Sequence, residues 1–174
     1  DEVDTLEPMY TDPAIWKRLI NIYDPLVRLD RDLKIEPALA LSWGLIDDRT
    51  WQFKLRSDVK FHDGSAFTVD DVIATFERAA TFNRLKTIEK IVKVDDFNFT
   101  IKTEKPDPLL LQTLSRVFIV PSERKSVKML LDMTDGTGPY TLLSWEKGKK
   151  MTLQRSDSYW GAKPKFKKVE IIYE

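Results

Sequence analysis

The chain has 174 residues, 42% hydrophobic and 32% charged, a composition that fits one globular domain and argues against disorder. Lys and Arg together number 28, as do Asp and Glu, so the formal net charge is zero and the basic surplus that nucleic-acid binding needs is absent. Without cysteine, disulfides, thiolate metal sites and a cysteine nucleophile are excluded. No run approaches the roughly 20 apolar residues of a membrane span. The acidic first residues lack the features of a signal peptide, so we expect that no signal existed or that it has been removed.

The first predicted element is a helix that begins after Asp12. Asp12 suits the N-cap, Pro13 suits the first helical position, and apolar residues with helical spacing continue from Ile15 to Tyr23. The Asp24-Pro25 pair predicts the end of this helix, because a residue before proline disfavours helical backbone. A turn-rich stretch follows over residues 29–33.

The middle of the chain predicts one strand and one longer helix. Strict alternation over residues 51–56 indicates a strand, and residues 62–64 form a turn. Thr68 and Asp71 make a short capping box that opens a helix. The apolar stripe of this helix consists of Val69, Val72, Ile73, Phe76 and Ala80.

The second half of the chain is typical of hairpins. Residues 88–94 and 97–101 form the first hairpin, a short helix spans 107–114, and 117–120 read as a buried strand closed by Pro121. Residues 122–135 have little pattern. A second hairpin joins 140–145 to 150–155, and a last strand covers 169–173. We therefore predict an α/β fold with a mixed, mostly antiparallel sheet and flanking helices.

Three stretches carry a resemblance to a known family. The first is Tyr23-Asp24-Pro25-Leu26-Val27, with Pro37-Ala38-Leu39-Ala40 and Ser42-Trp43. The second is Trp51-Gln52-Phe53-Lys54-Leu55-Arg56, with Val59-Lys60-Phe61-His62-Asp63-Gly64 and Asp70-Asp71-Val72. The third is Gly136-Thr137-Gly138-Pro139-Tyr140, with Ser158-Tyr159-Trp160-Gly161. In order and approximate spacing they resemble the family 5 bacterial extracellular solute-binding proteins, which include dipeptide-, oligopeptide- and nickel-binding members.

The resemblance implies part of lobe I of a periplasmic-binding-protein (type II) fold. Family members are longer and close two lobes over a solute, so residues 1–174 are expected to be an N-terminal lobe fragment. The expected role is the capture of a solute, most often a peptide, for an ABC permease. The expected location is outside the cytoplasm, with membrane association through the transporter or through a lipid anchor outside this chain. The partners implied are the small solute, the permease and the missing second lobe. The alternative is an excised or repurposed lobe that acts as a sensor or protein-interaction module.

An enzymatic role is not expected. The single histidine, His62, stands in a turn with no second histidine or cysteine to form a dyad or metal set. Adjacent acids such as Asp70 and Asp71 do not face each other on a helix or a strand. Neither a catalytic residue, a metal site nor a cofactor is therefore predicted, and the lysine-rich stretches at 147–150 and 163–168 are interpreted as solvated strand edges.

Two short segments are candidates for ligand contact. Met9, Tyr10 and Thr11 lie in a loop before a capped helix, and the resemblance implies that this loop lies at the mouth of the cleft. Met and Tyr offer adaptable apolar area and a hydroxyl group. The other candidates are Arg116, whose guanidinium suits a carboxylate, and Phe118. In both segments the alternative is a purely structural role.

Overall fold

The computed structural model describes residues 6–10, 12–124 and 134–173. Every strand pairing among these residues is antiparallel, as the alternating sequence patterns predict. In chain order the elements are α1 (Pro13–Leu19), β1 (Val27–Leu29), β2 (Ile35–Pro37), β3 (Ala40–Leu45), β4 (Thr50–Leu55), α2 (Val69–Thr81), β5 (Ile88–Lys93), β6 (Asn98–Thr103), α3 (Leu110–Leu114), the 3-10 helix η1 (Ser122–Arg124), β7 (Tyr140–Glu146), β8 (Lys150–Arg155) and β9 (Lys168–Ile172).

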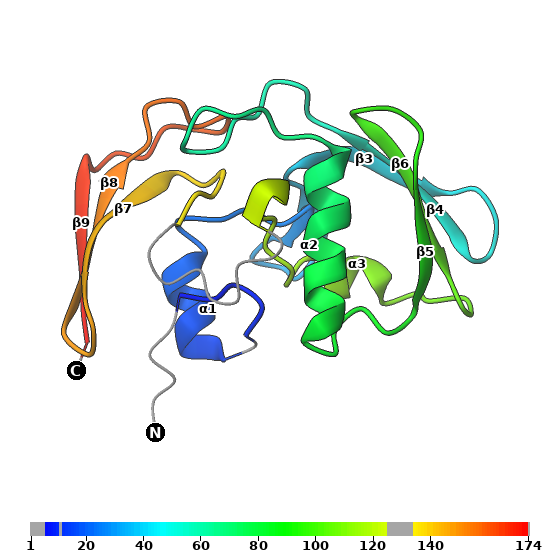
Figure 1. Cartoon of the computed structure of the whole chain (residues 1–174), viewed down its shortest axis with the longest axis horizontal. Helices are drawn as coiled ribbons and strands as arrows, with labels where there is room; N and C mark the ends of the chain where they lie inside the picture. The colour runs from blue at the N-terminus through cyan, green and yellow to red at the C-terminus, as the bar shows by residue number, and fades with distance from the viewer. Residues whose placement is uncertain (1–5, 11, 125–133, 174) are drawn as a thin grey trace.

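The described strands form three separate sheets. Their orders are β1-β2, β3-β4-β6-β5 and β7-β8-β9. Figure 1 shows the four-stranded sheet at one end of an elongated molecule, with α2 in front of it, and the three-stranded sheet at the other end, with α1 between. The predicted class is confirmed, although the single mixed sheet expected from sequence is divided into three.

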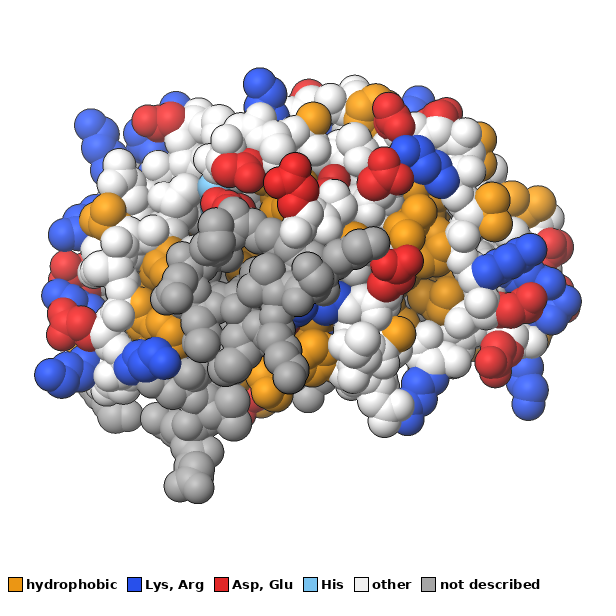
Figure 2. Space-filling view, in the orientation of Figure 1, with side chains coloured by type: hydrophobic (Ala, Val, Ile, Leu, Met, Phe, Trp, Pro, Cys, Tyr) orange, Lys and Arg blue, Asp and Glu red, His pale blue; other side chains and the backbone are white. Residues whose placement is uncertain are grey.

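Charged side chains of both signs surround the three-stranded sheet, over β7, β8 and β9 at the left of Figure 2. Lys163 pairs with Asp157 at 3.2 Å, and Lys150 and Lys168 both lie within 3.8 Å of Glu170. The lysine-rich stretches therefore lie among acidic partners at the protein surface. Among the described residues, no helix has the length and apolarity needed to cross a bilayer.

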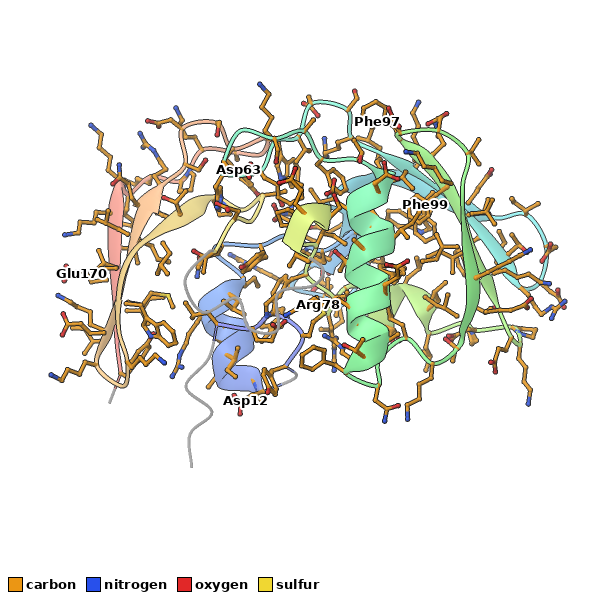
Figure 3. All side chains as sticks on the ribbon, viewed as in Figure 1. Asp12, Asp63, Arg78, Phe97, Phe99 and Glu170 are labelled. Atoms are coloured by element: carbon orange, nitrogen blue, oxygen red, sulfur yellow. The ribbon has the colours of Figure 1, made fainter. Side chains whose placement is uncertain are left out.

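One continuous apolar core joins the two ends of the molecule. In the four-stranded sheet Phe53 stacks on Phe99 with ring centroids 5.1 Å apart, as the alternation in β4 predicts. A buried ion pair lies next to this core, where Arg78 of α2 binds Glu7 of the N-terminal segment. Figure 3 shows Arg78 between α2 and that segment. The pair fixes the chain ahead of α1 to the longest helix.

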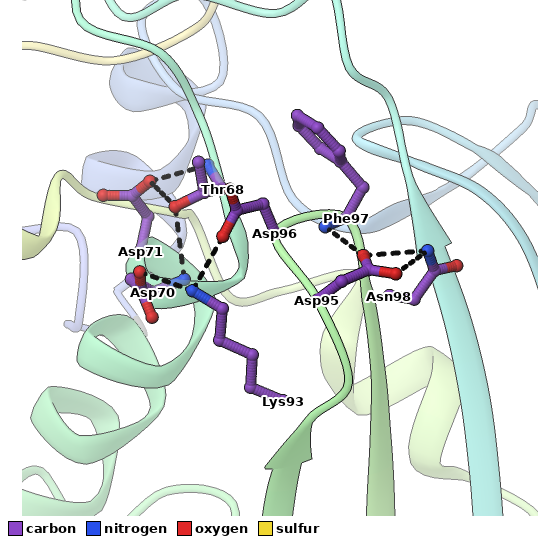
Figure 4. A network of polar contacts seen from close by, with 8 residues as sticks. All are labelled: Thr68, Asp70, Asp71, Lys93, Asp95, Asp96, Phe97 and Asn98. Carbon is purple, nitrogen blue, oxygen red and sulfur yellow. Dashed lines mark hydrogen bonds and ion pairs between the residues drawn. The ribbon is translucent and has the colours of Figure 1, made fainter.

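The N-terminus of α2 carries the predicted capping box. The backbone N–H of Thr68 donates to Asp71 Oδ2 at 2.8 Å, and the N–H of Asp70 donates to Thr68 Oγ1 at 3.3 Å. Lys93 at the end of β5 contacts Asp70 at 2.8 Å and Asp96 at 2.9 Å, so it ties the helix to the β5–β6 turn (Figure 4). The stripe is confirmed at Val69, Val72 and Phe76, whereas Ala79 is buried in place of Ala80.

The first predicted helix is shorter in the structure, and three strands lie where the sequence predicted none. The first helix starts at Pro13 with Asp12 as N-cap, as predicted, but it ends at Leu19. The N–H groups of Ile22 and Tyr23 both converge on the Leu19 carbonyl, at 2.8 and 2.9 Å, which makes a tight turn where a longer helix was expected. Strands β1 and β2 were missed because each has only three residues, and β3 was not expected at all.

The buried segment 117–120 is not a strand of any sheet. One isolated β-bridge joins Phe118 to Pro25, and individual hydrogen bonds join the segment to other parts of the chain. Val120 N donates to Thr75 Oγ1 at 3.0 Å, and Ile119 N donates to the Asp24 carbonyl at 3.0 Å. A helix side chain and a neighbouring loop thus satisfy the backbone groups that the prediction assigned to a strand ladder.

Candidate functional site

A cavity of about 510 Å³ opens between α1, the turn that follows it, the α2–β5 loop and the segment after α3. Its floor is aromatic, and Trp16 stacks on Phe118 with ring centroids 5.9 Å apart. The indole Nε1 of Trp16 is buried and has no hydrogen-bond partner among the described residues. A largely apolar hollow with a few polar groups is the usual form of a small-molecule site.

Two arginines form one wall of the cavity. The Arg84 guanidinium donates to the carbonyls of Arg116, at 2.8 Å, and of Met9, at 3.3 Å. Burial, and then the charge of Arg116, lower the pKa of Arg84 from its ordinary value. Among the described residues neither arginine has a carboxylate partner. Guanidinium groups that line a cavity favour an anionic guest.

The opposite wall centres on Asp24, of which only 6% is exposed. Its Oδ2 accepts hydrogen bonds from Thr137 Oγ1 at 3.0 Å and from Trp160 Nε1 at 2.9 Å. Burial, partly offset by these two hydrogen bonds, raises the pKa of Asp24 above its ordinary value. Tyr159 lines the same end, and burial, reinforced by the Asp24 charge, raises its pKa to about 12. Its phenol therefore stays neutral and keeps a proton to donate.

The raised pKa of Asp24 has a predictable effect on stability. Between the ordinary carboxyl pKa and the raised one, the folded chain binds more protons at this site than the unfolded chain, so its contribution to stability falls as pH rises. The contribution of Asp24 to folding stability is complete below the pKa of this carboxyl group in the unfolded chain. It is lost as pH rises through the pKa of the same group in the folded chain. We expect Asp24→Asn to remove this decline, so the variant gains stability relative to wild type as pH rises from the ordinary carboxyl pKa through the raised one. Urea unfolding across that range measures the difference.

Asp47→Asn is the matched control for this titration. Backbone N–H groups of Arg49 and Thr50, at 2.9 and 2.8 Å, donate to the exposed Asp47 and lower its pKa. The contribution of Asp47 is therefore present above the unfolded pKa and lost as pH falls, which is the opposite sign. If the free energy of unfolding, relative to wild type, changed with pH in the same way in both variants, the raised pKa of Asp24 would be contradicted.

The structure places three of the five candidate ligand residues on the cavity lining. Tyr10, Arg116 and Phe118 line it, and Tyr10 is 41% exposed. Met9 is 1% exposed and lies in the core, away from the lining, so packing is its role in this structure. Thr11 lies outside the described residues.

Sequence reasoning missed Arg84, Asp24 and Trp16 as residues of the cavity lining. The sequence indicates Trp16 as part of a helix, and Asp24 as the end of that helix and as part of the family resemblance. Arg84 stands between Asn83 and Leu85, whose φ angles of 61° and 58° are in the left-handed region. Such angles are uncommon outside glycine and concentrate at functional sites. The one signal available was an arginine in a short loop directly after a capped helix.

The described residues contain no group of three or more His, Asp or Glu side chains placed to hold a metal ion. His62 is not among the residues that line the cavity. The cavity therefore offers binding groups, namely guanidinium, carboxyl, phenol and indole, around an aromatic floor.

Comparisons with known proteins agree with this description. The profile of the bacterial extracellular solute-binding proteins, family 5 middle region, matches residues 34–173. The nickel-binding periplasmic protein of Escherichia coli is 33% identical over 85% of this chain and 31% of its own length. The probable D,D-dipeptide-binding periplasmic protein DdpA of the same organism is 30% identical over 95% of this chain and 37% of its own length.

A solved structure shows the same fold. The periplasmic binding protein DppA of Helicobacter pylori, in complex with the peptide STSA, superposes with a TM-score of 0.86 and 27% identity. The alignment covers 98% of this chain and 40% of that one. The chain thus spans about a third of the length of the curated relatives it matches.

The fold is that of the periplasmic binding proteins. With the profile match over most of its length, the chain belongs to family 5 of the bacterial extracellular solute-binding proteins. Members of this family bind small solutes and work with ABC permeases. The two relatives described above are named as binding proteins of the periplasm.

Proposed function

We propose that this chain forms part of the solute site of an ABC importer's binding protein and takes the carboxylate end of a peptide. The observation that carries the proposal is the pair Arg84 and Arg116 on the cavity wall, without a carboxylate partner among the described residues. A free peptide carboxylate has two oxygens that match a guanidinium in a bidentate pair. The aromatic floor accommodates the adjoining side chains of a peptide without selecting one of them.

The rest of the cavity supports a peptide as the guest. Peptides carry amide groups in addition to the terminal charges, and the Trp16 N–H and the Tyr159 hydroxyl both have a proton to offer to an amide carbonyl. Asp24 gives the opposite wall a buried carboxyl group. A guest with an anionic end and a polar backbone therefore meets a partner at each wall. The solute is captured without chemical change.

We further propose that residues 1–174 are a lobe fragment of a larger clamp. A second lobe would close over the open side of the cavity, complete the hydrogen bonds of the solute and present the closed form to the permease. The protein would be held at the membrane by the transporter or by a lipid anchor. The cavity is open to solvent on the side where Tyr10 and Arg116 are exposed. Because half of a site gives only part of the binding free energy, the chain alone is expected to bind a peptide with millimolar affinity.

The test compares alanylalanine with its C-terminal amide, which lacks the carboxylate. Titrations followed by NMR on the 174-residue chain should give a dissociation constant in the millimolar range for the dipeptide and binding about tenfold weaker or more for the amide. Arg116→Gln should abolish this preference, while Arg31→Gln, an exposed arginine outside the cavity, should keep it. Equal binding of dipeptide and amide to the wild-type chain would contradict the anion site. Submicromolar binding would contradict the half-clamp.

A further inference from the structure

The single histidine of the chain lies where the turn after Phe61 meets the loop that leads into β7. It contacts this glycine loop (Gly136, Thr137 and Gly138) through three groups. The backbone N–H of His62 donates to the Gly136 carbonyl at 2.9 Å, the N–H of Gly136 donates to imidazole Nδ1 at 3.2 Å, and imidazole Nε2 lies 2.9 Å from the Gly138 carbonyl. The imidazole thus bridges both ends of a three-residue loop.

These partners determine the protonation state of the ring. A carbonyl oxygen only accepts, so the proton must be on Nε2. A backbone N–H only donates, so Nδ1 must be without a proton. The neutral Nε2–H tautomer therefore satisfies both contacts at once. A proton on Nδ1 would face the Gly136 N–H, and the nearest carbonyl for it, that of Thr134, is 3.5 Å away.

The glycine loop in turn supports a wall of the solute cavity. Thr137 Oγ1 donates to Asp24 Oδ2, and the N–H of Gly138 donates to the Ile22 carbonyl at 2.8 Å. Asp24 and the residue after the loop, Pro139, both line the cavity. The imidazole is therefore connected to the cavity lining through the glycine loop.

We infer that His62 is a positioning residue of the solute site, which in its neutral Nε2–H form holds the glycine loop and, through it, Asp24 and Pro139 at the cavity wall. Protonation of the imidazole removes the acceptor of the Gly136 N–H and loosens this wall, so solute binding weakens in acid. The part that concerns the solute rests on the proposed function, whereas the part that concerns the loop does not.

Three acidic residues adjoin His62 or the glycine loop that it contacts. Asp63 follows His62 in its own turn, Asp135 precedes the glycine loop, and Asp24 lies across Thr137 and is sensitive to the charge of His62. The loop is therefore compared at pH 8 and pH 5, because this is the interval over which histidine side chains in general change charge.

The first readout is independent of any solute. Nitrogen-15 NMR of the 174-residue chain at pH 8 should show His62 as the Nε2–H tautomer. Exchange of the Gly136 amide, corrected for its intrinsic pH dependence, should become roughly three- to tenfold faster from pH 8 to pH 5, which is the effect of one hydrogen bond. The Nδ1–H tautomer at pH 8, or unchanged Gly136 protection, would overturn the inference.

The second readout uses two variants and the alanylalanine titration. A Gln carboxamide has an NH2 group that donates and an oxygen that accepts, but it does not titrate, so His62→Gln should bind the dipeptide like wild type at pH 8 and lose the His62-dependent weakening at pH 5. His62→Ala should bind several-fold more weakly at both pH values. The same pH dependence in wild type and His62→Gln would refute the positioning role. If the dipeptide binds at neither pH while Gly136 exchange responds as expected, the proposed function fails and the loop inference stands.

Discussion

Gly136→Ala is expected to destabilise the folded chain by about 3 kcal/mol or more, because a methyl group at this position has no room. A Cβ atom there would lie 1.9 Å from the Ile22 carbonyl oxygen and 2.9 Å from the Tyr23 ring. The obstructing atom belongs to the backbone, which cannot move aside as a flexible side chain does. The glycine loop and the turn after α1 would have to separate. Urea unfolding monitored by tryptophan fluorescence measures the loss.

Gly44→Ala is the matched control for this clash. Gly44 lies in β3, and the nearest atom to an added Cβ is Gln52 Nε2 at 3.9 Å, an ordinary contact. We expect a change in unfolding free energy within about 1 kcal/mol, in the direction of greater stability, since glycine weakens a strand interior. If both variants lose the same stability, the close approach of the glycine loop to Ile22 is wrong.

Arg78→Met is expected to cost about 3–5 kcal/mol of stability, because it removes one member of a buried ion pair. Side chains of the pair are only 5% and 1% exposed, and Arg78 Nε also lies 3.3 Å from Glu7 Oε1. The N–H of Met9 donates to the same oxygen at 3.1 Å, so the pair helps to hold the segment that carries Tyr10. Adding Glu7→Gln to Arg78→Met should recover most of the loss, because the buried group is then neutral.

The control is an exposed ion pair of similar geometry. Arg28 and Glu36 approach to 2.6 Å across the β1–β2 hairpin, with side chains 49% and 41% exposed. Surface pairs contribute less than about 1 kcal/mol, so Glu36→Gln, which removes the carboxylate of this pair, should have a small effect on unfolding. A loss at Glu36 as large as that at Arg78 would show that burial does not set the energy of these pairs.

Local patterns were sufficient to predict much of the fold. The helix start at Asp12, the capping box at Thr68 and the hairpins at residues 88–103 and 140–155 each depend on residues a few positions apart. The segment 117–120 failed because an apolar β-branched run looks the same whether it joins a sheet or crosses the core alone. Its partners, Thr75 and Asp24, are distant in sequence and belong to no strand.

The candidate site was predicted less completely, for a related reason. Tyr10, Arg116 and Phe118 were identified by residue type and by the resemblance, and all three lie on the cavity lining. Asp24 gains its role only from Thr137 and Trp160, which are 113 and 136 residues away along the chain. No local pattern reveals such partners.

The position of Arg84 depends on backbone geometry more than on pattern. Two left-handed residues flank it, and neither is glycine, so composition gave no sign of the turn that directs this arginine to the Arg116 carbonyl. The structure therefore adds the second cation of the proposed carboxylate site, which a list of residue types could not supply.

The most direct test of the account is to locate a bound dipeptide on the chain. Intermolecular NOEs between alanylalanine and the isotope-labelled 174-residue chain should connect its methyl groups to the rings of Trp16 and Phe118 on the cavity floor. The side-chain resonances of Arg84 and Arg116 should shift in the same titration. NOEs only to side chains outside this cavity, with both arginines unperturbed, would contradict the claim that these walls receive the solute.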